Sequence, residues 1–185
     1  MNTTRVLIPV AAMLGLAGCC TIPEMISLLP LFTETETVFD DALLGKWQEK
    51  GESTILEILK DGDKGYVVRN ADPDPSAKKD DDALHFTMGR IGGILFVSFS
   101  QPDRLGHWFA KVTFDRGHIE VYPIDTDWLK EKVVEQNQLA HMELPYAGCK
   151  VMAISAPTSE LQYFMLRYGT DPDAFEPVTE LKRVE

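Results

Sequence analysis

The sequence has little positive charge and little cysteine. Its 18 lysines and arginines are outnumbered by 29 aspartates and glutamates, which gives a formal net charge of −11 at pH 7. This balance repels phosphate backbones and anionic lipid head groups, and no basic patch interleaved with aromatic residues offsets it. We therefore expect no nucleic-acid partner, and we expect the acidic surface to keep the domain soluble.

The chain also lacks the motifs of the common catalytic classes. It contains no Gly-x-Ser-x-Gly elbow, no His-Glu-x-x-His pair and no phosphate-binding glycine loop. A metal site would require the 4 histidines to converge in a way that their spacing does not show; they are His85, His107, His118 and His141. We therefore expect no catalytic residue and no metal. An enzyme of unknown class stays open as an alternative.

The apolar run at the start of the chain is too short to span a bilayer. Residues 6–16 are eleven apolar residues interrupted only by Pro9, whereas a spanning helix needs about 20. Arg5 precedes the run, and the small residues Ala17 and Gly18 follow it. A positive flank, a short apolar core and small residues predict a secretory signal peptide that is cleaved after them.

The stretch Leu16-Ala17-Gly18-Cys19 resembles the lipobox of bacterial lipoproteins. The resemblance implies that the signal is cut before Cys19, that the Cys19 thiol carries diacylglycerol, and that the new amino terminus is acylated. Three acyl chains would be the only covalent group, with no further cofactor, and would hold the protein permanently on a bilayer. By analogy with lipoprotein sorting, Cys20 in place of aspartate favours the outer membrane, facing the periplasm, in a cell with two membranes.

Cys20 and Cys149 are the cysteines that remain after such processing. Cys20 could accept a further acyl chain, both could stay as thiols, or the two could form a disulfide. An oxidising envelope compartment permits the disulfide. If both stay free, we expect Cys149 to be a small buried hydrophobic residue.

The chain divides into a signal, a linking segment and one domain. Residues 1–18 are the predicted signal peptide. Residues 19–38 contain two prolines and no clean period, which predicts a lipidated tether, with residues 25–32 free to dock on the domain or on lipid. The remainder, residues 39–185, is long enough for one domain with a real core and too short for two comfortable ones.

The first part of the domain predicts an antiparallel meander. Seven short runs rich in β-formers are separated by turns; they are residues 46–50, 54–60, 65–70, 83–89, 94–100, 107–115 and 118–124. A sheet of that many strands closes on itself or splits into two layers, because open edges invite association. Residues 70–82, with two prolines and five aspartates, predict a solvent loop within the meander.

Two helices and two further strands are predicted after the meander. Residues 125–127 offer an N-cap for a helix that runs to Leu139. Thr158 or Ser159 caps a second helix with an apolar stripe that ends at Gly169; the stripe is Leu161, Phe164, Met165 and Tyr168. We expect both helices to pack on the sheet. Residues 150–155 and 178–184 predict strands.

The start of the domain carries Gly45-Lys46-Trp47 after a short helical turn, which resembles the Gly-x-Trp start of lipocalins. The resemblance implies a small up-and-down barrel with Trp47 at its closed end and a basic residue over the indole. Arg183 in the last predicted strand is our candidate for that cation–π contact. Glycine would let the chain bend tightly, and a large flat side chain would fill the tapered end of the barrel.

The predicted fold class is mainly β (α+β): an antiparallel meander that closes into a small lipocalin-like barrel, with two C-terminal helices packed on it. The chain departs from the lipocalin pattern because helices and late strands follow the meander. A β-sandwich and a curved open sheet with helices on one face therefore stay open.

Two non-enzymatic functions are compatible with these features. In the first, the protein is an anchored, non-catalytic interaction or structural module that presents a surface, such as residues 70–82 or the tether, to another envelope protein. In the second, the barrel carries an apolar or amphipathic small molecule, and its candidate lining is Phe86, Phe96, Phe99, Trp108, Phe114 and Tyr122. Bulky residues expected to point inward favour a filled barrel and hence the first function; they are Ile55, Ile58, Val67, Phe96 and Phe114.

Overall fold

A computed structural model describes residues 25–71, 83–102, 104–146 and 148–184. Its sheet contains 12 strands within these ranges. The strands are β1 (Met25–Ser27), β2 (Thr37–Val38), β3 (Gly45–Glu49), β4 (Ile55–Asp61), β5 (Gly65–Asn70), β6 (Leu84–Ile91), β7 (Ile94–Ser100), β8 (His107–Phe114), β9 (His118–Pro123), β10 (His141–Tyr146), β11 (Cys149–Ile154) and β12 (Thr179–Val184).

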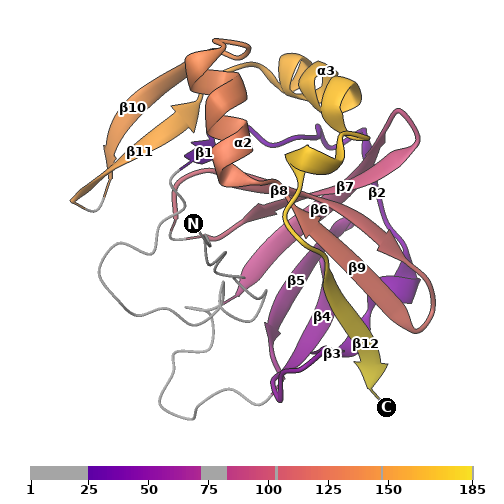
Figure 1. The fold of residues 1–185 in the computed structure, drawn as a ribbon. Helices are drawn as coiled ribbons and strands as arrows, with labels where there is room; N and C mark the ends of the chain where they lie inside the picture. Colours follow the sequence, from indigo (N-terminus) through magenta and orange to yellow (C-terminus); the bar gives the residue numbers. More distant parts are fainter. Residues whose placement is uncertain (1–24, 72–82, 103, 147, 185) are drawn as a thin grey trace, which may run out of the picture.

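Eight of these strands form a closed antiparallel barrel (Figure 1). Strands β3 to β9 pair with one another in chain order. The last strand, β12, pairs with both β9 and β3 and closes the cycle. The seven β-runs of the meander and the two later strands are thereby confirmed, while β10 is a strand that the sequence pattern did not predict. Closure excludes the sandwich and the open sheet.

Tight turns keep the meander in register. Between β6 and β7, Ile91 pairs with Ile94, so Gly92 and Gly93 form a two-residue turn. Both glycines have positive φ, 58° and 84°, as the hairpin turn that matches strand twist requires. Alternation along each strand then sends one set of side chains inward and the other outward.

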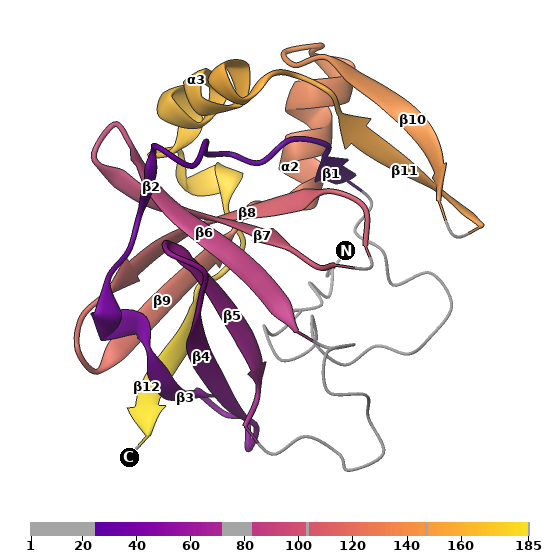
Figure 2. The same ribbon diagram turned by 180° about the vertical axis from the view of Figure 1, so that it is seen from behind.

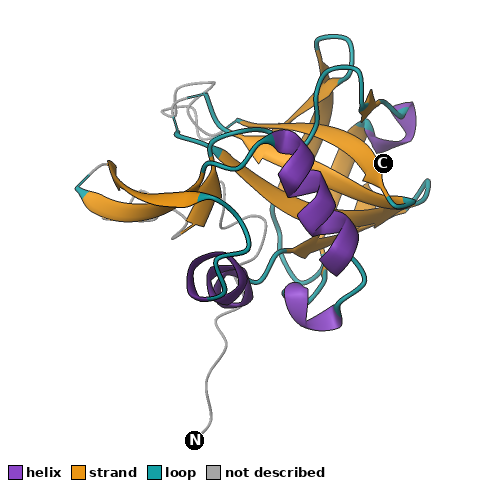
Figure 3. Cartoon of the chain, turned by 90° about the horizontal axis from the view of Figure 1, so that it is seen from above, coloured by secondary structure: helices purple, strands orange, loops and turns teal. Residues whose placement is uncertain are grey.

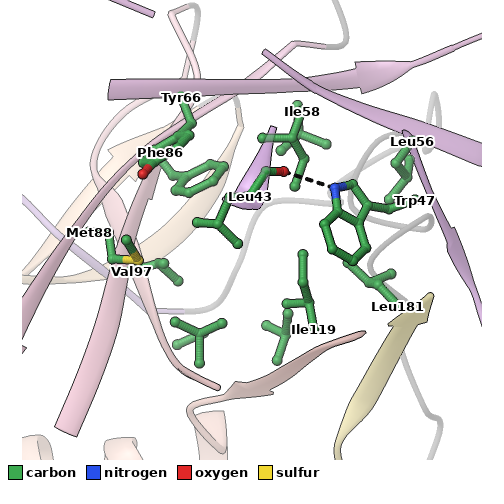
Figure 4. Packing of buried hydrophobic residues seen from close by; sticks show 14 of the residues in the cluster. Leu43, Trp47, Leu56, Ile58, Tyr66, Phe86, Met88, Val97, Ile119 and Leu181 are labelled. Carbon is green, nitrogen blue, oxygen red and sulfur yellow. Dashed lines mark hydrogen bonds between the residues drawn. The ribbon is translucent and has the colours of Figure 1, made fainter. Parts of the chain in front are cut away.

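The inward side chains form a filled core (Figure 4). Trp47 is completely buried, and its Nε1 donates a hydrogen bond to the Leu43 carbonyl at 2.9 Å. Leu43 belongs to the short 3-10 helix η1 (Asp41–Leu43), which the Asp40 side chain caps by accepting a hydrogen bond from the Ala42 amide. The indole therefore ties the entry turn to the core.

Arg183 on β12 makes the contact with Trp47 that the sequence predicted. Its Cζ lies 4.5 Å from the centroid of the Trp47 ring. The guanidinium also donates hydrogen bonds to the carbonyls of Ala42, Leu44 and Arg116, so it joins η1 to the β8–β9 turn. Gly45 has φ of 128°, and a Cβ there would lie 2.8 Å from Arg183 Nη1. Glycine is thus required by both backbone and space.

The segment from Met25 to Val38 is part of the fold. Residues 25–32 dock on the domain, which is one of the two options predicted for them, and the predicted domain start at residue 39 is too late. Strand β1 pairs with β11 and β8, and β2 pairs with β6. Leu31 and Phe32 are buried, and a Cβ at Gly89 of β6 would lie 2.5 Å from the Phe32 ring. The sequence did not predict this packing, because the apolar side chains of the segment follow no helix or strand period. They pack instead in the buried cluster that includes α3.

The chain between β9 and β12 is an insertion beside the barrel. It contains α2 (Thr126–Lys130), the π-helix η2 (Glu131–Glu135), β10, β11, α3 (Thr158–Tyr168) and the 3-10 helix η3 (Pro172–Ala174). Seen from above, the β10–β11 hairpin projects away from the barrel (Figure 3). The helices are therefore not at the C-terminus, because β12 follows them and completes the barrel.

Helix α3 contributes to a second buried cluster on the outer wall of the barrel. Leu161, Phe164 and Met165 pack with Phe96 of β7 and with Leu31 of the N-terminal segment. Viewed from behind, this segment runs between β1 and β2 below α3 (Figure 2). The predicted apolar stripe is confirmed, but its predicted cap is not, since Pro157 is the N-cap and Thr158 donates instead to the Pro30 carbonyl.

The first helix also differs from its prediction. Asp125 caps α2 as expected, accepting a hydrogen bond from the Trp128 amide at 2.7 Å. The helix widens to a π-helix at Glu131 and ends at Glu135, four residues before the predicted end at Leu139. In the part of the chain that the structure describes, no helix has the length and apolar character to cross a membrane.

We predict that Arg183→Ala lowers the free energy of unfolding by about 1–3 kcal/mol, because it removes the cation–π contact and three hydrogen bonds at a partly solvated site. Urea denaturation measures the change. Lys182→Ala, at the exposed neighbouring position, is the control and should stay within about 0.5 kcal/mol of the wild type. Equal stability of the two variants would contradict this role for Arg183.

Candidate functional site

The barrel interior leaves little room for a ligand. Its cavity has a volume of about 50 Å³ and is lined by apolar side chains such as Leu56, Val97 and Val121. Small-molecule sites usually have volumes of about 300–1,000 Å³. Stacked rings fill part of the space, since the centroid of Tyr66 lies 4.8 Å from that of Phe39 and 4.6 Å from that of Phe86.

The six aromatic residues proposed as lining do not share one face. Phe86 is buried in the interior cluster, and three others pack against that cluster while half-buried; they are Phe99, Trp108 and Phe114. Phe96 points outward and is covered by α3, so its assignment as lining is wrong. The assignment of Tyr122 is also wrong, because it lies on the outer face beside Lys111, whose Nζ is 4.8 Å from its ring centroid.

The large cavity is on the outer face of the barrel. A cleft of about 750 Å³ lies between the N-terminal segment, the β4–β5 turn and the strands β6 to β8. Its apolar lining includes Pro30 and Phe32, and its polar lining includes Thr87, Ser98 and Ser100. This volume and this mixture of surfaces are typical of a site for a small molecule or for a partner's side chains.

Strand register aligns two histidines and a serine in this cleft. Ser100 on β7 pairs with His85 on β6 and with His107 on β8. Directly opposed residues in an antiparallel pair share a face, with Cβ atoms about 4.5–5.5 Å apart. The spacing of the histidines along the chain did not show this alignment, which the register creates by placing His85 and His107 on either side of Ser100.

A hydrogen-bond contact with Asp61 orients His85. Its Nδ1 lies 2.7 Å from Oδ2 of Asp61, which reaches across β5 from the end of β4. The intervening residue in the register is Gly65, which pairs with Asp61 on one side and Thr87 on the other. A Cβ at Gly65 would lie 2.6 Å from the Asp61 carbonyl oxygen. A side chain at position 65 would therefore collide with the Asp61 backbone, so glycine allows the close approach of β4 and β5 at this turn.

Burial controls the charge of His107. Desolvation lowers the pKa of this imidazole from its usual 6.5, which favours the neutral ring at pH 7. A neutral imidazole offers one donor and one acceptor.

Acidic groups outnumber basic ones along the cleft, where Glu34, Asp61 and Asp63 face Lys64.

The cleft brings together a carboxylate, an imidazole and a hydroxyl without the hydrogen bond that would activate the hydroxyl. A carboxylate-oriented imidazole beside a hydroxyl has the composition of an activated serine, but activation requires a hydrogen bond between the base and the hydroxyl. Among the described contacts, none joins Ser100 to His85. The described ranges also contain no group of three histidine, cysteine, aspartate or glutamate side chains that could hold a metal ion.

Sequence reasoning missed this cleft, although a signal was present. His85 and Thr87 alternate with buried apolar residues on β6, and Ser98 and Ser100 alternate with the apolar residues Val97 and Phe99 on β7. Polar side chains at alternate positions of neighbouring strands could have indicated a shared polar face. The row itself could not be found without the pairing register.

The lipidation candidate Cys19 lies outside the described residues. So do residues 72–82 of the predicted solvent loop. Cys149, at the start of β11, is disulfide-bonded. Of the states that the sequence left open for Cys149, the structure has the disulfide-bonded one and not the free thiol.

Comparison with known proteins adds no assignment: no family model, no curated protein and no solved structure matches the chain. The functional argument consequently depends on the geometry and on the sequence patterns.

We predict that His107 makes the fold sensitive to acid. Because its folded pKa is lowered, the unfolded chain takes up the proton first, so the free energy of unfolding falls as the pH drops through 6.5 toward the folded pKa. His107→Gln should reduce this loss. Urea denaturation from about pH 8 to about pH 5 measures it, and an identical pH dependence in the variant and the wild type would contradict the prediction.

Proposed function

We propose that the chain is a lipid-anchored lipoprotein of a bacterial cell envelope, and that its barrel is a non-catalytic module that binds a partner on its outer face. The observation that supports this most is the contrast between the two cavities. The interior has about 50 Å³, whereas the outer cleft has about 750 Å³ and carries polar groups on three neighbouring strands.

A filled interior disfavours the alternative of a carrier. Loading the barrel would displace side chains that are already close-packed, and cores lose several kcal/mol when their packing is disturbed. The outer cleft needs no such rearrangement. Its carboxylates, hydroxyls and imidazoles can accept and donate hydrogen bonds, and Phe32 with Pro30 supplies an apolar wall.

A lipocalin-like architecture is supported by three features of the barrel. These are the Gly-x-Trp start, the cation–π contact of Arg183 with Trp47, and the meander of strands β3 to β9. The difference is that the eighth strand, β12, follows the insertion of residues 124–178. We propose that the protein is a lipocalin-like barrel with this insertion as its own elaboration.

The anchor is supported by the lipobox-like residues and by the place where the fold begins. Met25 is 6% exposed and already paired with β11, so the fold starts six residues after Cys19. Six residues span at most about 20 Å. A lipidated Cys19 would therefore hold the domain close to the bilayer. In a cell with two membranes we propose the outer membrane, facing the periplasm.

The first prediction concerns the anchor. Protein extracted from its own membrane should have the mass of a chain that begins at Cys19 and carries three acyl chains, measured by intact mass spectrometry. Cys19→Ser should abolish the added mass and release the protein from the membrane, because the acceptor thiol is lost. Cys149→Ser is the matched control and should keep the acyl chains. An unmodified wild-type terminus would contradict the anchor.

The second prediction concerns the cleft. A photo-reactive benzoylphenylalanine in place of Lys64, on the rim of the cleft, should cross-link to a partner in intact cells. Lys46 is the matched control, because it is an exposed lysine on β3. In the eight-strand cycle β3 lies four strands away from β7, whose Ser98 and Ser100 line the cleft. We expect several-fold more cross-linked product from position 64, read by mass spectrometry. Equal yields from both positions would contradict binding at the cleft.

A further inference from the structure

We propose that the outer edge of β10 is an interface between two copies of this chain, which pair their β10 strands antiparallel about a two-fold axis at Met142. The proposal goes beyond the binding cleft, because no residue that lines the cleft belongs to β10. It starts from the place of β10 in the sheet, where β10 pairs with β11 and is the last strand on that side (Figure 1). Within the described ranges, no strand pairs with its outer edge.

The register fixes which backbone groups of β10 face outward. The Ser155 amide donates to the Ala140 carbonyl at 2.8 Å, so these residues form a hydrogen-bonded pair. Such pairs alternate with non-hydrogen-bonded pairs along an antiparallel ladder. Residues at even positions of β10 are therefore bonded to β11, whereas the backbone groups of His141, Glu143 and Pro145 point away from it.

Pro145 agrees with this outward phase. Proline has no amide hydrogen, and within sheets it is confined to edge strands, where its nitrogen faces away from the neighbouring strand. At position 145 it therefore costs β10 no bond to β11. It also limits the stretch that can receive a further strand, so the outward donors of β10 are the amides of His141 and Glu143.

The side chains select one register for the second copy. Pairing centred on Glu143 opposes two like charges and sets Pro145, which has no amide hydrogen, opposite His141. Pairing centred on Leu144 sets Pro145 opposite Glu143. Pairing centred on Met142 instead sets His141 opposite Glu143 in both halves, and residues opposed in this way exchange two amide–carbonyl bonds. Of the three, this register alone uses every outward amide that it covers.

The same register brings apolar side chains together. Alternation puts Ala140, Met142 and Leu144 on one face of the strand. Met142 is 45% exposed, and Ala140 is exposed as well. In the pairing about Met142, the two methionines meet at a non-hydrogen-bonded position with Cα atoms about 4.5 Å apart, and Leu144 faces Ala140. The edge is thus complementary to itself, which a two-fold interface requires.

The polar face of the strand is compatible with this pairing. Glu143 forms an exposed ion pair with Lys150, whose Nζ lies 2.7 Å from its Oε1. The His141 Nδ1 donates to the Leu139 carbonyl at 2.9 Å, because a carbonyl oxygen only accepts. An imidazole opposite a carboxylate that already has a cation beside it avoids the repulsion of like charges.

Photo-cross-linking in intact cells tests the interface. A benzoylphenylalanine in place of Met142 should give a covalent dimer in which both linked peptides come from tryptic residues 133–150, read by mass spectrometry after reduction. The same group in place of Tyr163, which is 70% exposed on α3, is the matched control. We expect several-fold more dimer from position 142. Equal dimer yields, or a product with a different protein, would overturn the proposal.

Two substitutions of Glu143 separate the backbone from the side chain. Glu143→Pro removes an outward amide hydrogen and spares the bonds to β11, so each copy loses one intermolecular bond. The dimer association constant should fall by about thirtyfold. Glu143→Ala keeps the amide and should lower the constant by less than about fivefold. Sedimentation equilibrium of the full-length protein in density-matched detergent measures both, and equal constants would overturn the pairing.

A charge at the axis provides a second test that does not depend on the fold of the proline variant. Met142→Lys is a change at an exposed site and opposes two ammonium groups, so it should abolish the dimer at every concentration measured. A folded Met142→Lys protein that is still dimeric would overturn the proposal.

Hydrogen exchange, read residue by residue, provides an independent measurement. The amides of His141 and Glu143 should exchange more slowly as the protein concentration rises, because they enter bonds with the second copy. The amides of Met142 and Leu144 are bonded to β11 in a single copy and should be protected at every concentration. Unchanged exchange at His141 and Glu143 in a dimeric sample would show that another surface forms the dimer and would overturn the proposal.

Discussion

Closure of the barrel by β12 is the constraint on which the rest of the structure depends. Strands β3 and β9 would otherwise be open edges, and β12 pairs with both of them. Arg183 strengthens this closure, because it lies over Trp47 and binds carbonyls on either side of the seam. The insertion of residues 124–178 must therefore leave the barrel and return to it, which places its helices and hairpin beside one wall.

The covered wall determines where binding can occur. Helix α3 and the segment from Met25 to Val38 pack over the outer faces of β6 and β7, and the cleft opens where this cover ends. Trp47 and its neighbours fill the interior. The polar row of His85 and Ser100 therefore lies on the outside of the barrel. Rigid strands hold His85 and His107 in place, and Asp61 fixes the first of them.

Local patterns predicted the wrong face for several strand residues, although Ile58 and Phe86 point inward as expected. Ile55, Val67 and Phe96 were expected to point inward, yet the interior cluster takes Leu56, Val68 and Val97 instead. Each is shifted by one residue, and such a shift reverses the face in a strand. The same limitation hid the row through Ser100, since residues on three strands share a row only after pairing is known.

The sequence alone determined the number and position of the meander strands, the closing role of Gly45, Trp47 and Arg183, and the apolar stripe of α3. The strands and the stripe follow from local turn chemistry and side-chain period, and the Trp47–Arg183 contact was expected from the resemblance to lipocalins. Only the tertiary structure decided that residues 25–38 belong to the fold, that β10 pairs with β11, and that the cleft is outside. Each of these depends on contacts between segments distant in the chain, which no local pattern encodes.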